Sequence, residues 1–92
     1  MSKIELVTFT NIKQIIGKKQ LEVFADTVED VINKLIEQYG NLLREELFDH
    51  EGNLKKIYRI IVNGRNINLL EGFQTKLKDD DMVVIMPAIA GG

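Results

Sequence analysis

At 92 residues and 10.5 kDa the chain has room for one domain, because folding at this size buries roughly 60% of the extended surface and supports one modest core. With 45% hydrophobic and 28% charged residues, the composition excludes a disordered chain. A formal net charge of −2 argues against nucleic acid or an anionic membrane surface as a partner. The absence of cysteine excludes disulfides and thiolate metal ligands, and without a cationic, apolar leader we expect a cytoplasmic protein.

The first elements predicted along the chain are two strands, at residues 4–9 and 20–24. The first is rich in apolar, β-branched and aromatic side chains, and the second alternates between polar and apolar positions. Because the connection over residues 11–17 is short, the two strands are expected to pair antiparallel.

A long helix over residues 28–39 is the clearest predicted element. Apolar residues recur from Val28 to Tyr39 at spacings of three and four, which is the stripe of a helix that packs on one side. Thr27 can cap the first turn, and Gly40 can adopt the left-handed conformation just past the last one. The start and stop signals therefore agree.

Three further strands are predicted in the second half of the chain. Asn63-Gly64 favours a tight turn between the first two, and the polar run at 78–81 favours a turn before the last. Residues 41–53 are expected to form a short helix or an ordered loop at the edge of the core. The three strands are residues 57–62, 65–67 and 82–86.

The order β-β-α-β-β-β predicts an α+β fold of the β-grasp, ubiquitin-like type. For one long helix to cover one face of a mixed sheet, the first and last strands should lie side by side in its middle. We assign residues 1–86 to a single β-grasp domain and residues 87–92 to a flexible C-terminal Gly-Gly tail.

The polar side chains predict no catalytic or metal site. His50 is the only histidine, and its neighbours Asp49 and Glu51 do not converge with it on one ligand, so a solvated loop is expected. The Lys-Asp-Asp-Asp run at 78–81 lacks the spacing of a calcium loop, and no glycine lies in a phosphate-binding motif. We therefore expect no bound metal or cofactor and no catalysis by this chain alone.

The end of the sequence, residues 86–92, is uncharged and mostly apolar, whereas chain ends are usually polar. Pro87 lacks an amide hydrogen and is expected to end the hydrogen-bonding ladder of the last strand. Ile89 offers one apolar side chain to a groove, and Gly91 and Gly92, without a Cβ, can pass through a narrow channel. These features predict an arm that presents the carboxylate of Gly92 to a partner.

A carboxylate is a poor electrophile, so such an arm implies activation by another protein, most economically as an acyl-adenylate formed from ATP. Attack by sulfide or persulfide then gives a thiocarboxylate, and attack by a lysine amine gives an isopeptide bond. The residues alone allow both outcomes.

The whole chain resembles the MoaD/ThiS-type ubiquitin-like sulfur carriers, and most closely the small subunit of molybdopterin synthase. The most specific match is MPAIAGG, which is similar to the tail pattern of aromatic, Pro, Pro, Val, Ala or Thr, Gly, Gly. Further matches are FTNIKQIIGKK, TVEDVINKLIEQYG, VNGRNI and LKDDDMVVIMP. Met86 replaces the usual phenylalanine, Ala88 the second proline and Asp80 the turn glycine.

The resemblance implies that an adenylyltransferase similar to ubiquitin-activating enzymes uses ATP and magnesium to adenylate Gly92, which then becomes a thiocarboxylate. It also implies that the tail enters the large subunit of molybdopterin synthase, in a heterotetramer, and donates sulfur for molybdenum or tungsten cofactor synthesis. Catalysis would reside in the partner subunits. The tail residues implied to enter the partner are Pro87, Ala88, Ile89, Ala90, Gly91 and Gly92.

A partner-facing apolar patch of Phe9, Ile67 and Met86, on the sheet face opposite the helix, is also implied by the resemblance. For Phe9 and Ile67 the alternative is a place in the core.

Other functions stay open at this point. The chain can serve as a sulfur carrier for thiamine synthesis or tRNA thiolation, or as a ubiquitin-like protein modifier conjugated to lysines. In another class, it can be a non-covalent β-grasp interaction module whose tail is incidental. This last function predicts full activity after Gly91 and Gly92 are deleted.

Overall fold

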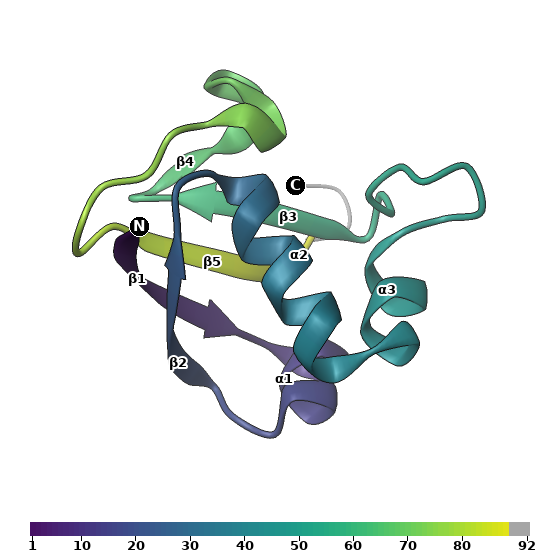
Figure 1. Cartoon of the computed structure of the whole chain (residues 1–92). Helices are drawn as coiled ribbons and strands as arrows, with labels where there is room; N and C mark the ends of the chain where they lie inside the picture. Colours follow the sequence, from purple (N-terminus) through teal and green to yellow (C-terminus); the bar gives the residue numbers. More distant parts are fainter. Residues whose placement is uncertain (89–92) are drawn as a thin grey trace.

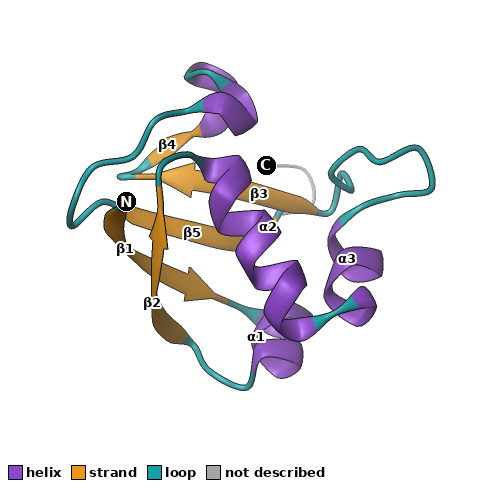
Figure 2. Ribbon diagram, viewed as in Figure 1, coloured by secondary structure: helices purple, strands orange, loops and turns teal. Residues whose placement is uncertain are grey.

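The structure, a computed structural model, describes residues 1–88 and shows a twisted sheet with the longest helix lying across one face (Figures 1 and 2). The short helices gather at the ends of the strands. In chain order the elements are β1 (Ser2–Thr8), α1 (Thr10–Ile16), β2 (Gln20–Ala25), α2 (Val28–Tyr39), α3 (Asn41–Leu47), β3 (Tyr58–Val62), β4 (Arg65–Asn66), η1 (Ile67–Leu69), η2 (Gly72–Gln74) and β5 (Met82–Pro87).

The first and last strands lie side by side in the middle of the sheet, as predicted. Over residues 1–88 the sheet has five strands in the order β2-β1-β5-β3-β4. β1 and β5 are parallel, with Leu6 opposite Val83, whereas the other neighbouring pairs are antiparallel. This mixed sheet with its crossing helix confirms the α+β, β-grasp prediction.

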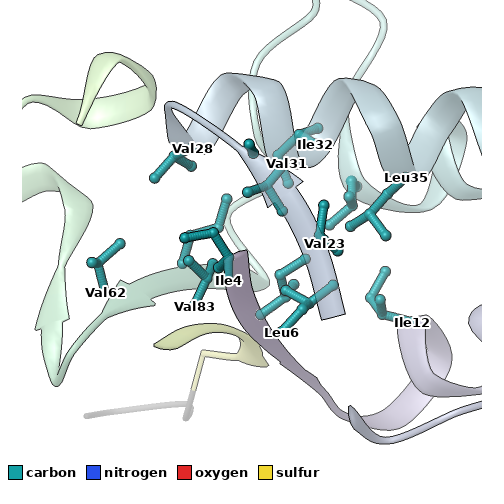
Figure 3. Packing of buried hydrophobic residues seen from close by; sticks show 14 of the residues in the cluster. Ile4, Leu6, Ile12, Val23, Val28, Val31, Ile32, Leu35, Val62 and Val83 are labelled. Atoms are coloured by element: carbon teal, nitrogen blue, oxygen red, sulfur yellow. The ribbon is translucent and has the colours of Figure 1, made fainter. Parts of the chain in front are cut away.

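The core lies between α2 and the sheet. Val31 and Leu35 on α2 are at most 1% exposed, as are Ile4 and Leu6 on β1 and Val83 on β5. Figure 3 shows the helical side chains extending toward those of the central strands. Because side chains alternate along a strand, the residues between these positions face the opposite side of the sheet.

The ends of α2 carry the predicted caps. The hydroxyl of Thr27 accepts a hydrogen bond of 3.2 Å from the amide of Asp30, which satisfies a first-turn donor. At the other end, Gly40 has a φ of 81° and its amide donates to the carbonyl of Ile36 at 2.7 Å. The positive φ favours glycine, but with a ψ of −163° Gly40 does not adopt the left-handed helical conformation that was predicted for it.

Two connections form short helices. The segment after β1 forms α1, and of the two alternatives predicted for residues 41–53 the structure shows the short helix, α3, which packs near α1 and α2. In contrast, β4 is shorter than predicted and stops at Asn66. The side-chain oxygen of Asn66 accepts a hydrogen bond of 2.9 Å from the amide of Asn68, and this cap begins the 3₁₀ turn that includes Ile67.

Candidate functional site

The last described residues belong to the sheet. Pro87 lies opposite Tyr58, and the amide of Ala88 donates a hydrogen bond of 2.7 Å to the carbonyl of Ile57. The sequence prediction ended the strand at Met86, so pairing with β3 extends further than predicted. The base of the tail is therefore anchored to β3 at least as far as Ala88.

The position of Pro87 explains why a proline is accepted within this pairing. The amides of Asn63 and Ala88 donate to the carbonyls of Met82 and Ile57, so the even-numbered residues of β5 make the hydrogen bonds to β3. The missing amide hydrogen of Pro87 would point to the other side, where pairing with β1 ends at Ile85. Pro87 thus ends the ladder on the β1 side only.

Tyr58 fixes the beginning of β3, next to the base of the tail. Its side chain is 5% exposed, and its hydroxyl donates a hydrogen bond to the carboxylate of Glu46 on α3. Burial, reinforced by the hydrogen bond and the negative charge of Glu46, raises the pKa of Tyr58 well above its ordinary value. The phenol therefore stays neutral and holds the strand against the helix.

The sheet face opposite α2 has an apolar centre. Val7, Val84 and Ile61 lie directly opposite one another across β1, β5 and β3, and all three are half-buried. Met86 and Met82 follow on the same side of β5. We call the four half-buried residues the open-face patch: Val7, Ile61, Val84 and Met86.

The predicted patch is only partly formed by the structure. Met86 lies on this face, and the extended backbone of Phe9 continues the alternation of β1, which directs its half-buried ring to the same side. The ammonium of Lys19 lies 5.4 Å from the centroid of that ring. Ile67, however, is 3% exposed and belongs to the core, because β4 ends before it. Its assignment to an exposed patch was wrong.

Sequence reasoning missed the centre of this face. Val7, Ile61 and Val84 alternate with the buried residues of their strands, and that alternation is the signal by which they could have been found. The resemblance drew attention to three other positions instead. These three residues become neighbours only through the register in which β1, β5 and β3 pair, and that register cannot be read from the sequence.

The polar residues considered as metal or catalytic candidates have structural roles. Asp49 accepts hydrogen bonds from the amides of Glu51 and Asn53 at 2.9 and 3.0 Å, which shapes the loop, and His50 is exposed. Asp81 accepts from the amide of Lys78 at 2.8 Å within its turn. In residues 1–88 no group of three or more His, Cys, Asp or Glu side chains is placed to hold a metal ion.

Within the same described part of the chain, no helix has the length and apolar character needed to cross a membrane. The predicted tail residues Ile89, Ala90, Gly91 and Gly92 lie outside the described residues. Their insertion into a partner, and the chemistry at Gly92, stay predictions.

Comparisons with known proteins bear on the same features. A model of the ThiS family matches residues 6–92. Small archaeal modifier protein 3 of Haloferax volcanii is 32% identical over 93 residues, which cover 98% of this chain and 99% of the relative. Sulfur carrier protein CysO of Mycobacterium tuberculosis is 35% identical over 78 residues, or 83% of each chain. The solution structure of small archaeal modifier protein 1 from Methanosarcina acetivorans superimposes with a TM-score of 0.83 at 32% identity and covers 100% of this chain and 98% of the other.

Proposed function

Because the chain belongs to the ThiS family, whose ubiquitin-like relatives include sulfur carriers and protein modifiers, we propose that it carries sulfur on the carboxylate of Gly92. The observation that carries the proposal is the connection between β5 and the terminal Gly-Gly. Four residues follow Ala88, which is held by β3, and four residues span at most about 14 Å when extended. Gly92 can therefore be no more than about 14 Å from Ala88, at the end of the central strand β5.

The proposed reaction has two steps, both catalysed by partners. An oxygen of the Gly92 carboxylate attacks the α-phosphorus of ATP, with magnesium on the nucleotide, and pyrophosphate leaves. Sulfide then attacks the carbonyl carbon of the acyl-adenylate, AMP leaves, and a thiocarboxylate remains. The chain itself contributes the carboxylate and the surface by which the adenylyltransferase holds it.

The open-face patch is the proposed contact surface for that adenylyltransferase. Val84 and Met86 belong to the strand that continues into the tail, so a partner that binds them is positioned to receive Gly92. Half-buried apolar side chains at the centre of a face supply area that a partner can remove from water. Arg59, exposed and opposite Met86, adds a charged rim that can fix the orientation of the partner.

The proposed sulfur acceptor is a pterin precursor bound to the large subunit of molybdopterin synthase. This finer assignment is supported by the likeness of MPAIAGG to the tail of the small subunit. Ile89, Ala90 and Gly91 would then lie in the channel of the large subunit, with Gly92 at its catalytic centre. Pro87 and Ala88, which the resemblance also assigned to the inserted tail, pair with β3 and would form its base. The substituted tail positions, Met86 and Ala88, can adapt the tail to a different acceptor.

A second candidate, conjugation to lysines, is favoured by the 32% identity to small archaeal modifier protein 3 over almost the whole of both chains. The two functions share the acyl-adenylate and differ in the nucleophile that attacks it. The two functions can be distinguished by expressing the chain with an N-terminal tag in cells and looking for tagged adducts. Isopeptide-linked adducts that disappear when Gly92 is deleted would indicate a modifier.

The direct test is the intact mass of the chain after incubation with the host's adenylyltransferase, ATP, magnesium and sulfide. We expect one oxygen to be replaced by one sulfur in the natural chain. We expect no change in a chain without Gly92 or with one residue added after it, because both displace the carboxylate while the domain stays folded. An unchanged natural chain, with an enzyme proved active on another carrier, would contradict the proposal.

A further inference from the structure

A basic depression lies at the outer edge of β3, on the side of the sheet where β4 is found. It has a volume of about 390 Å³, and its wall includes Lys55, Lys56 and Arg59. Asn66 and Asn68 line it as well, and the buried side chains of Tyr58, Ile60 and Ile67 contribute its apolar part. No acidic residue in the described part of the chain lines this depression.

The charge of the depression is unusual for this molecule, which has more acidic than basic residues. In residues 1–88 the cations that form ion pairs are the amino terminus of Met1 and the side chain of Lys3, so Lys55, Lys56 and Arg59 form none there. Glu46 is engaged by the hydroxyl of Tyr58, and Asp49, which lines a neighbouring cavity with Glu45 and Lys55, accepts hydrogen bonds from the amides of Glu51 and Asn53. A local cluster of positive charge is therefore available to an anionic partner.

The backbone gives the depression an elongated form. The ladder between β3 and β4 contains two residue pairs, Ile61 with Asn66 and Val62 with Arg65. In the described residues, the first half of β3, Tyr58 to Ile60, has no strand neighbour on this side. Lys55 and Lys56 come just before this half of the strand and Arg59 lies within it, so the positive charges belong to one short stretch of extended chain.

We propose that this depression binds an extended acidic segment of a partner protein, with carboxylates beside Lys55, Lys56 and Arg59 and an apolar side chain over the buried floor. Carboxylates accept charge-assisted hydrogen bonds from lysine and arginine. The asparagine amides supply further donors. Cations in the stretch beside an unpaired half-strand fit an extended peptide, which can add to the free strand edge, better than a single phosphate.

The inference does not depend on the chemistry of Gly92, because the depression lies on β3 and its neighbours rather than on the tail, although Arg59 borders both this depression and the open-face patch. Its test uses the full chain and a defined probe, the peptide acetyl-Glu-Glu-Leu-Glu-Glu-amide, added at constant ionic strength. Amide resonances of the ¹⁵N-labelled chain report the position of binding. We expect shifts concentrated at residues 55–60 and 66–68.

The decisive variant is the double change Lys55→Glu and Lys56→Glu. We expect it to weaken binding by about tenfold or more, because two attractive contacts become repulsive. The control, Lys18→Glu with Lys76→Glu, changes the net charge equally at two exposed loop positions and should stay within about twofold of the natural chain. Thermal unfolding of all three proteins shows whether each is folded.

Several results would overturn the proposal. Shifts spread over all surface lysines, or equal weakening in both double variants, would indicate non-specific attraction. The same shifts with inorganic phosphate at equal ionic strength would indicate a site for small anions. Deletion of residues 89–92 places a new carboxylate beside Ile57, so shifts at residues 55–60 are expected in any case. If this deletion also moves the resonances of residues 66–68 without peptide, the chain's own tail occupies the depression.

Discussion

The two faces of the sheet use the same strands for different purposes, and two consecutive isoleucines on β3 show the contrast. Ile60 is 1% exposed and packs beneath α2, whereas Ile61 lies half-buried on the open face opposite Val84. The covered face accounts for the stability of the domain. The open face leaves apolar area that only a partner can cover, so similar side chains have different consequences when they are truncated.

The largest loss of stability is expected from truncating a side chain on the covered face. Ile60→Ala should lower the free energy of unfolding by about 2–5 kcal/mol, because it removes buried methyl and methylene groups and leaves a cavity. Leu35→Ala on the facing helix, where the side chain is 1% exposed, should cost a similar amount. Denaturant unfolding measures both. A loss of less than about 0.5 kcal/mol at either position would contradict the assigned packing.

Tyr58→Phe tests the link between the covered face and the base of the tail. Loss of the hydrogen bond to Glu46 should cost about 1–2 kcal/mol near neutral pH.

The raised pKa of Tyr58 adds a pH dependence to this comparison. Above the ordinary tyrosine pKa of about 10, the unfolded chain loses the phenolic proton while the folded chain keeps it, so stability falls as the pH rises. The Tyr58 contribution is fully present below that pH and is lost above it. Unfolding curves of the natural chain and Tyr58→Phe should therefore converge in alkali, and a constant difference would show that the pKa is not raised.

Ile61→Ala is the matched partner of Ile60→Ala on the open face. We expect a stability loss of about 1 kcal/mol or less, since the side chain is only half-buried. The KM for this chain in the adenylation reaction should instead rise by about tenfold, through lost apolar contact with the enzyme. An unchanged KM, with Ile61→Ala folded, would remove the open-face patch from the proposed interface.

The smallest effect is expected at the turn before β5. Asp80 replaces the glycine of the family pattern and has a φ of 71°, a left-handed conformation that strains residues with a Cβ. Asp80→Gly relieves this strain and should raise the free energy of unfolding by at most about 1 kcal/mol. The gain is reduced by loss of the exposed ion pair between Asp80 and Lys3, at 3.8 Å. Activity should not change. A destabilised variant would show that the ion pair outweighs the strain.

The sequence by itself determined the elements whose signals are local. The spacing of apolar residues from Val28 to Tyr39, with Thr27 before them and Gly40 after them, specified α2 because residues three and four apart share one face of a helix. The order of strands then specified the β-grasp class. The unusual Gly-Gly end and the MPAIAGG pattern pointed to the family.

The tertiary structure alone decided which residues share a surface. Ile67 became core because Asn66 caps a 3₁₀ turn, and Pro87 stayed paired because its missing donor faces away from β3. The open-face patch and the basic depression each join segments far apart in the chain, such as Lys55 and Asn68. Local periodicity states which face of its own element a residue occupies, whereas strand register and the path of the loops set its neighbours.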